Sequence, residues 1–202
     1  MRLGSDTALL VHSLQNGSFE RYSSDSTKPQ SWTALGDVRT LTQLGELTPQ
    51  GAGNRRMAIV TTGIGAQYNA QFSNGTEGSA ISQTFYIPQG ANRLSFTYNY
   101  VSEEPMEYVN SQYDDSFVVK IETGGKEWYT QTLATINKSS WLSVSGINFT
   151  GGDDTTYQTG WQFAEIDVSA LQGKVVTLRF IVYDVGDAKY DTVCLIDNVR
   201  IE

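Results

Sequence analysis

Hydrophobic and polar residues alternate along most of this chain, which is the period of a β-strand with one buried face. The segment RLSFTYNYV, residues 93–101, shows the pattern clearly, because every second residue from Leu94 to Tyr100 is apolar or aromatic. The same alternation recurs in DSFVVKIET, residues 115–123, and in KVVTLRFIVYD, residues 174–184. Each of these segments predicts a strand that turns one face toward a core.

Further strand-like segments are MAIVTT (57–62), AISQTFYI (80–87), KEWYTQTL (126–133), WLSVSGINF (141–149) and WQFAEIDV (161–168). Glycine, asparagine, aspartate and proline separate them, and only DVSALQG, residues 167–173, resembles a short helical turn. The pattern therefore predicts an all-β protein of roughly nine or ten strands, folded as a two-sheet antiparallel β-sandwich of the jelly-roll type. We expect residues 1–202 to form a single domain, with residues 1–7 disordered or derived from a tag.

The final strand segment, TVCLIDNVRI, contains an aspartate within an otherwise apolar alternation. The face that we expect to turn inward carries Val193, Leu195, Asp197, Val199 and Ile201. A buried carboxylate is costly unless a cation or a set of hydrogen bonds compensates its charge. Because the first and last strands of a sandwich are often neighbours, Glu20 in LQNGSFE is a candidate partner of Asp197 in a structural cation site. A hydrogen-bonded buried aspartate is the alternative.

Composition excludes several classes of function. The formal net charge of the 202 residues is −8, which disfavours binding to nucleic acid or to an anionic membrane surface. The chain has one cysteine, Cys194, and one histidine, His12. It can form no internal disulfide, no thiol cluster and no histidine-rich zinc site, and a Ser-His-Asp hydrolase has little support. No segment is long and apolar enough to insert into a membrane.

Two acidic segments are the strongest chemical signal. VSEEPMEYVNSQYDDSF (101–117) and YDVGDAKYDTVCLIDN (183–198) each place several carboxylates between strand-like segments. Oxygen ligands at uneven spacing on glycine-containing loops suit Ca²⁺, whereas the alternative is a pair of ordinary turns. We therefore expect bound Ca²⁺, and the candidate ligands are Glu103, Glu104, Asp114, Asp115, Asp184, Asp187, Asp191, Glu20 and Asp197.

Short motifs carry a resemblance to known families. NGSFE near the start, Trp32, and LIDNVRI at the end resemble the frame of carbohydrate-binding-module and galactose-binding-like jelly rolls, which commonly hold a structural calcium between their terminal strands. The two acidic segments are also similar to choice-of-anchor domains of exported bacterial surface proteins. SEEPMEYV departs from that pattern in the position of its proline, and Asp114 replaces an asparagine. The resemblance implies a secreted or cell-surface setting.

The first functional hypothesis is a non-catalytic, calcium-stabilised binding or adhesion module. Its partner would be a glycan or surface polymer, or a peptide, and we expect a monomer or one part of a longer chain. Aromatic rings stack on sugar rings at little entropic cost, although packing within the protein is the alternative role for each of them. The candidate ligand-binding residues are Tyr108, Tyr113, Trp128 and Tyr157.

Two other classes remain open. A jelly-roll glycoside hydrolase or lyase would need two facing carboxylates, which Glu103 or Glu104 could form with Asp114 or Asp115. These acids lie in a connection between strands rather than on a groove-lining strand, which disfavours catalysis. A purely structural spacer domain of an adhesin is the third class.

Overall fold

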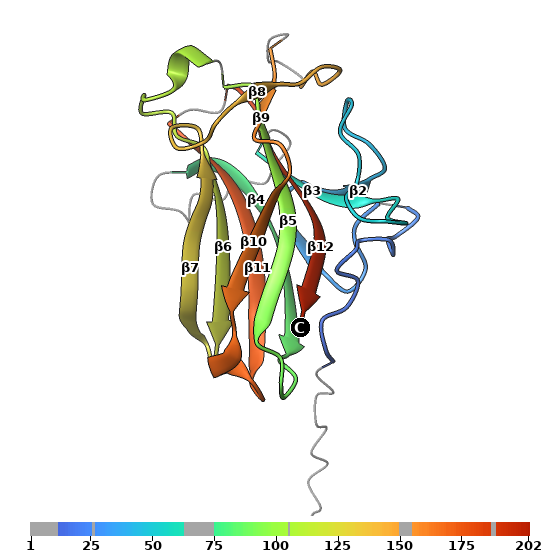
Figure 1. Ribbon diagram of the computed structural model, residues 1–202. Coiled ribbons are helices and arrows are strands. Elements are labelled where there is room, and N and C mark those ends of the chain that lie inside the picture. The colour runs from blue at the N-terminus through green and yellow to red at the C-terminus, as the bar shows by residue number, and fades with distance from the viewer. Residues whose placement is uncertain (1–11, 26, 63–74, 105, 150–154, 187–188) are drawn as a thin grey trace, which may run out of the picture.

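The computed structural model describes residues 12–25, 27–62, 75–104, 106–149, 155–186 and 189–202. Within these residues twelve strands form two sheets, and every pairing between them is antiparallel. Figure 1 shows the two sheets packed face to face. The predicted all-β sandwich is confirmed, and short strands in the connections raise the strand number above the prediction.

The five-stranded sheet has the order β1-β4-β11-β6-β7. Its strands are β1 (Thr33–Leu35), β4 (Gly75–Tyr86), β11 (Val175–Val185), β6 (Ser116–Thr123) and β7 (Lys126–Thr135). The other sheet has the order β2-β3-β12-β5-β9-β8, and β10 also pairs with β5. Its strands are β2 (Val38–Leu41), β3 (Met57–Thr61), β12 (Thr192–Ile201), β5 (Arg93–Ser102), β9 (Tyr157–Gln158), β8 (Leu142–Ser143) and β10 (Gln162–Asp167).

Two short 3-10 helices complete the described structure. The helix η1 (Met106–Tyr108) lies in the connection between β5 and β6, at the upper end of Figure 1. The helix η2 (Ser169–Leu171) follows β10 at the lower end and falls within the segment predicted as a helical turn. Gly173 ends that turn with φ +76°, a conformation that glycine adopts without steric cost.

The main core lies between the two sheets and follows the predicted alternation. On β11 it takes every second residue from Val176 to Val182, and on β5 every second residue from Leu94 to Tyr100. The rings of Phe96 and Phe180, one from each sheet, meet edge to face with centroids 4.8 Å apart. Aromatic pairs in this geometry add stability beyond the area that they bury.

A second core covers part of the outer face of the seven-stranded sheet. Its buried members are Leu47, Met57, Ile59, Val101, Val144, Ile147, Val193 and Leu195. The segments 41–47 and 144–149 cover this face, and they approach closely at Gly45, where an added Cβ would lie 2.5 Å from Cγ1 of Ile147. This half of the sheet is therefore buried on both faces.

The expected inward face of β12 is wrong for Val193, Leu195 and Asp197, whereas Val199 and Ile201 do pack on the main core. Cys194 and Ile196 point into the main core, whereas Val193 and Leu195 belong to the second core on the outer face. Asp197 continues the outer face, and the register of β12 against β5 then shifts between Asp197 and Arg200. Asn198 has φ +54° at this irregularity, and beyond it Val199 returns to the main core. A sequence alternation cannot reveal a face reversed by a bulge.

The second core makes a testable contribution to stability. Replacing Leu195 by alanine leaves a cavity beneath the segments 41–47 and 144–149, so we expect a loss of about 2–5 kcal/mol in the free energy of unfolding. Urea unfolding of both proteins measures the difference. Thr132→Ala, an exposed change on β7 of the other sheet, is the control and should lie within about 0.5 kcal/mol of the wild type. Equal stability of Leu195→Ala and wild type would contradict the second core.

Candidate functional site

The two acidic segments meet at the upper end of the sandwich, where β5 and β11 end and β6 and β12 begin. Asp115 connects them. Its Oδ1 accepts a hydrogen bond of 2.9 Å from the backbone N–H of Val185, and its Oδ2 accepts one of 2.5 Å from the Thr192 hydroxyl. The Thr192 hydroxyl also lies 2.9 Å from the hydroxyl of Ser102. The fold thus joins all four strand ends around one carboxylate.

The other acidic side chains of this region are largely enclosed by protein. Glu103 is fully buried, and its Oε1 accepts a 2.9 Å hydrogen bond from the backbone N–H of Phe149. Glu104 and Asp184 are also buried, at 5% and 3% exposure. Asp114 accepts a 2.8 Å hydrogen bond from the backbone N–H of Asn137. These contacts fix the conformation of both connections.

A calcium site spanning the two segments stays a prediction. In the part of the chain that the structure describes, no three side chains of aspartate, glutamate, histidine or cysteine converge as a metal site. Asp187 lies outside the described residues, and Asp191 contributes a backbone carbonyl that accepts a 3.0 Å hydrogen bond from the N–H of Glu103.

Burial dominates the electrostatics of Asp115. It raises the pKa of Asp115 well above its ordinary value, and the neighbouring charge and hydrogen bond of Asp184 raise it further. The hydrogen bonds from Thr192 and from the Val185 N–H act in the opposite direction. Two carboxyl groups in one buried site cannot both ionise cheaply, so Asp115 binds a proton more readily than an exposed aspartate does.

The four predicted ligand-binding aromatics do not form one site. Tyr108 and Tyr113 pack against each other edge to face, with ring centroids 5.5 Å apart, and Tyr190 adjoins Tyr108 at 6.0 Å. All three are partly buried by this packing. Trp128 lies on the edge strand β7 of the five-stranded sheet and Tyr157 on β9 of the other sheet, and no ring contact of the described residues joins either of them to that cluster. The sequence identified aromatic residues but could not place them relative to one another.

The segment 50–56 wraps around Glu20 and Asp197. The Oε1 atom of Glu20 accepts hydrogen bonds of 2.7 and 2.9 Å from the backbone N–H groups of Arg55 and Arg56. Asp197 is fully buried, and its Oδ2 accepts a 2.9 Å hydrogen bond from the N–H of Gln50. Burial raises the pKa of Asp197 to about 6, the negative charge of Glu20 adds to the effect, and hydrogen bonds partly offset it.

Oxygen atoms converge beside Asp197. The side-chain nitrogen of Asn54 lies 2.7 Å from the carbonyl oxygen of Gln50, 3.1 Å from Oδ1 of Asn198, and 3.1 and 3.2 Å from the two carboxylate oxygens of Asp197. An amide NH₂ has two hydrogens and cannot donate fully to four oxygens. Carboxylate, carbonyl and amide oxygens are the ligands that Ca²⁺ prefers, so this donor set fits a calcium ion.

The lower half of the outer face of the seven-stranded sheet is open. Below the second core, β10 presents Phe163, which is 65% exposed and the most exposed large hydrophobic residue described. Phe163 lies opposite Thr97 of β5 in the register, and Glu165 lies opposite Ser95. Trp161, two residues before Phe163 on the same side of the chain, packs on the second core. An exposed aromatic ring thus borders a row of polar side chains.

Two adjoining hollows lie on this uncovered part of the sheet. The first, of about 330 Å³, is lined by Gly51, Arg93, Ser95, Thr97, Phe163, Glu165, Asn198, Arg200 and Glu202. The second, of about 540 Å³, lies toward the lower end and is lined by Asn92, Arg93, Glu165, Asp167, Ser169 and Glu202. Three residues, Arg93, Glu165 and Glu202, line both hollows. We call the two hollows together the open face.

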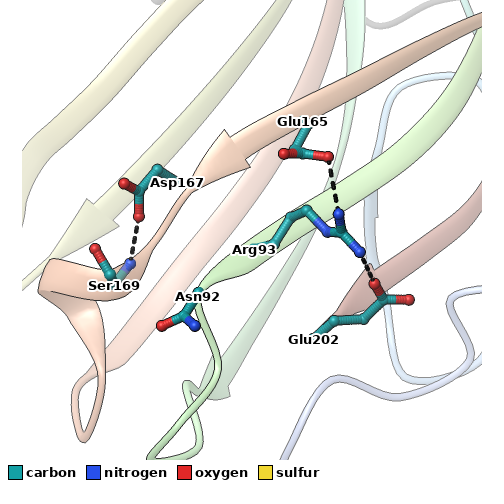
Figure 2. A pocket seen from close by; sticks show the side chains of 6 residues that line it. All are labelled: Asn92, Arg93, Glu165, Asp167, Ser169 and Glu202. Atoms are coloured by element: carbon teal, nitrogen blue, oxygen red, sulfur yellow. Dashed lines mark hydrogen bonds and ion pairs between the residues drawn. The ribbon is translucent and has the colours of Figure 1, made fainter.

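Arg93 lines both hollows and lies between Glu165 and Glu202, as Figure 2 shows. Its Nη1 donates to Glu165 at 3.3 Å, and its Nη2 donates to Glu202. The hydrogen bond from Arg93 lowers the pKa of Glu202, and the two carboxylates raise the pKa of Arg93. Glu202 therefore stays ionised beside an ionised arginine at neutral pH.

Sequence reasoning missed the open face. The segment WQFAEIDV was predicted as a strand, and its alternation already separates Phe163, Glu165 and Asp167 from Ala164 and Ile166. Its mixture of one phenylalanine with acids gave no sign that the phenylalanine faces solvent. Only the pairing of β10 with β5 brings Phe163 beside the polar residues of β5 and the arginine of β12.

Comparison with known proteins identifies the fold. TmCBM61 in complex with β-1,4-galactotriose is 14% identical, with 95% of this chain and 97% of that chain covered and a TM-score of 0.52. Caldicellulosiruptor saccharolyticus CBM27-1 in complex with mannohexaose is 19% identical, with coverages of 92% and 90% and a TM-score of 0.51. The chain has the fold of these carbohydrate-binding modules.

The K2 cleaved adhesin domain of Lys-gingipain shares this fold, with 16% identity, coverages of 92% and 96% and a TM-score of 0.50. No family model matches the chain, and no curated protein matches its sequence. The expected jelly-roll frame is thus supported by structure, whereas the resemblance to choice-of-anchor domains stays a prediction. Among the described residues no helix is long and apolar enough to cross a membrane.

Protonation of Asp115 should link stability to pH. Because its pKa is raised in the folded protein, its contribution to stability is fully present below the unfolded pKa of about 4 and is lost as pH rises through the folded pKa. We expect the free energy of unfolding of the wild type, relative to Asp115→Asn, to fall as pH rises from acidic to neutral. Urea unfolding across this pH range, with a chelator present, measures it.

Asp167→Asn is the control with the opposite sign. Hydrogen bonds from Ser169 lower the pKa of the exposed Asp167, so its contribution is present above the unfolded pKa and is lost as pH falls. If both variants change the pH dependence in the same direction, the role assigned to the buried site of Asp115 is wrong.

Proposed function

We propose that this chain is a non-catalytic glycan-binding module, and that its ligand binds to the open face. The observation that carries the proposal is the exposed ring of Phe163 beside hydrogen-bonding side chains on the flat outer face of a sheet. A sugar ring has an apolar face that stacks on an aromatic ring and hydroxyl groups around its edge that exchange hydrogen bonds. The open face offers both kinds of contact side by side.

The fold adds support of a general kind. TmCBM61 and CBM27-1 carry oligosaccharides on the same sandwich architecture. Fold alone does not determine function, so the proposal depends on the residues of the site. Here the second core closes the upper half of the outer face and leaves only the lower half for a ligand.

Catalysis receives less support from the same geometry. Three of the four acids predicted as a hydrolytic pair are buried, since Glu103 and Asp115 have 0% exposure and Glu104 has 5%, and the fourth, Asp114, is partly buried. On the open face, Glu165 and Glu202 are both paired with Arg93, and the pKa of Glu202 is lowered. A glycosidase acid needs a raised pKa so that it carries a proton at neutral pH.

Calcium would act as a structural ion beside Asp197. Glu20, Asp197, Asn198 and the carbonyl of Gln50 would hold it, because their oxygens converge around the segment 50–56. The ion would neutralise two carboxylates that lie close together and would tie this segment to β12. Since Gly51 and Asn198 also line the open face, the same ion would stabilise one rim of the ligand site.

The cellular setting proposed for the module is secreted or on the bacterial cell surface. Both the resemblance of its acidic segments to exported domains and its fold, shared with an adhesin domain, agree with this setting. A spacer that binds nothing would have the same fold, and glycan binding separates the two functions.

Phe163→Ala should weaken glycan binding. Loss of a stacked ring removes about 1.5–3 kcal/mol of apolar contact, which corresponds to roughly tenfold or more in Kd. Titration calorimetry with β-1,4-galactotriose and mannohexaose, preceded by a glycan array, measures the effect. Trp128→Ala is the matched control, because Trp128 is an exposed aromatic on the other sheet. If Trp128→Ala weakens binding and Phe163→Ala does not, the site lies elsewhere.

Removal of calcium should lower the melting temperature. A ligand present at about 100 times its Kd stabilises the folded state by about 2.7 kcal/mol, which shifts the Tm of a chain of this size by about 5–10 °C. Asp197→Asn should abolish most of the shift, and Asp167→Asn should leave it intact. Asp115→Asn tests the site predicted between the acidic segments. Equal melting with calcium and with chelator would refute both sites.

A further inference from the structure

The guanidinium of Arg93 is neutralised within the open face. Glu165 and Glu202 lie on opposite sides of it, one on β10 and the other just after β12 (Figure 2). Each accepts one hydrogen bond from a different terminal nitrogen of the arginine. Arg93 is about half exposed, at 46% of its side chain, so its remaining surface faces the ligand.

We propose that Arg93, held by Glu165 and Glu202, makes the open face select uncharged sugar chains and reject chains that carry carboxylate or sulfate groups. This inference rests on the proposed function and concerns the same site. Arg93 is the residue that contacts the ligand. Glu165 and Glu202 are positioning residues: their carboxylates balance the positive charge of Arg93 and orient its guanidinium.

Hydrogen-bond stoichiometry supports this role. A guanidinium has five N–H donors, and a free one binds a carboxylate through two parallel hydrogen bonds. In this site two of the five, one on each terminal nitrogen, already donate to Glu165 and Glu202, so an incoming carboxylate would have to compete with two carboxylates that are in place. The three remaining donors can reach neutral hydroxyl groups, which accept hydrogen bonds without bringing further negative charge.

The other charged residues around Arg93 also disfavour the binding of anionic sugars. The open face has two arginines, Arg93 and Arg200, and three acids, Glu165, Asp167 and Glu202. Arg200 donates to Asn198 at 3.3 Å and also lies close enough to Glu202 to influence its charge. An anionic sugar would therefore meet a surface with more negative than positive charge, within a chain of net charge −8. Like charges at such distances oppose binding.

The continuity of the two hollows indicates the length of the ligand. Along β10, Asp167 lies four positions after Phe163, a distance of about 13 Å in an extended strand. Arg93 lines both hollows, so a chain that starts at Phe163 passes over Arg93 before it reaches Ser169. The selection therefore acts on an inner unit of a sugar chain rather than on its end.

The test is a change of selectivity. Polygalacturonate serves as the anionic probe, and β-1,4-galactotriose and mannohexaose serve as neutral probes. We expect the wild type to bind polygalacturonate more weakly than the neutral probes. The double variant Glu165→Gln, Glu202→Gln should gain at least about tenfold in affinity for it at low ionic strength, the usual size of one charge-assisted hydrogen bond. The gain should disappear at high salt and when Arg93→Ala is added.

Glu127→Gln is the matched control. Glu127 is an exposed glutamate paired with Lys120 at 3.1 Å on the other sheet, so its change alters the net charge by as much as either single variant does but leaves the open face unchanged. Gain of polygalacturonate binding by this control would show a general charge effect and overturn the proposal. Each single variant, Glu165→Gln or Glu202→Gln, should give part of the gain, which keeps the test valid if the double variant unfolds.

Other outcomes separate the two proposals. If the wild type binds polygalacturonate through Phe163 as tightly as the neutral probes, the glycan-binding function stands and the selection by Arg93 is wrong. If the double variant stays folded and gains nothing, the selection is also wrong. If no wild-type or variant protein binds any probe or any glycan on an array, the glycan-binding function itself fails and the selection fails with it.

Discussion

The position of the candidate ligand site depends on one constraint: only part of the outer face of the seven-stranded sheet is covered by other segments of the chain. Near the ends where β5 finishes and β12 starts, apolar residues such as Val101 and Leu195 face outward and must be covered, and the segments 41–47 and 144–149 cover them. Toward the other end the outward residues become polar, from Thr97 to Arg93 on β5, and need no cover. The boundary between apolar and polar residues on a single sheet face therefore decides where a ligand can bind.

Asp197 lies at that boundary and connects the two halves. Its carboxylate is buried under the segment 50–56, while its backbone carbonyl accepts a hydrogen bond from Thr97, a residue of the open face. Burying the negative charge of this carboxylate costs free energy. Hydrogen bonds offset part of that cost, and a calcium ion would offset the rest. Stability of this segment and the shape of the ligand site are thus linked through one side chain.

At the upper end of the sandwich, where the two acidic segments meet, the buried acids have a different role. Asp115 joins four strand ends through its hydrogen bonds to Val185 and Thr192, and the nearby Asp184 makes its ionised form costly. The acids between β5 and β6, for which the sequence predicts a cation site and offers a catalytic pair as the alternative, also form a buried connection between strands. The open face instead keeps its carboxylates exposed and paired with Arg93, so the two acidic regions of the molecule have different physical roles.

Period-two alternation determined the all-β sandwich and the inward faces of β5, β6 and β11, and the helix-like segment 167–173 predicted the short turn before Gly173, because these depend on local geometry and burial. It could not determine the outer core, since burial of both faces of a strand produces no alternation to detect. Nor could it place Val193, Leu195 and Asp197, because a bulge at Asn198 exchanges the faces of β12. Only the tertiary pairing of β10 and β12 with β5 placed Phe163 on the same outer face as Arg93 and set Arg93 between two glutamates that are far apart in the sequence.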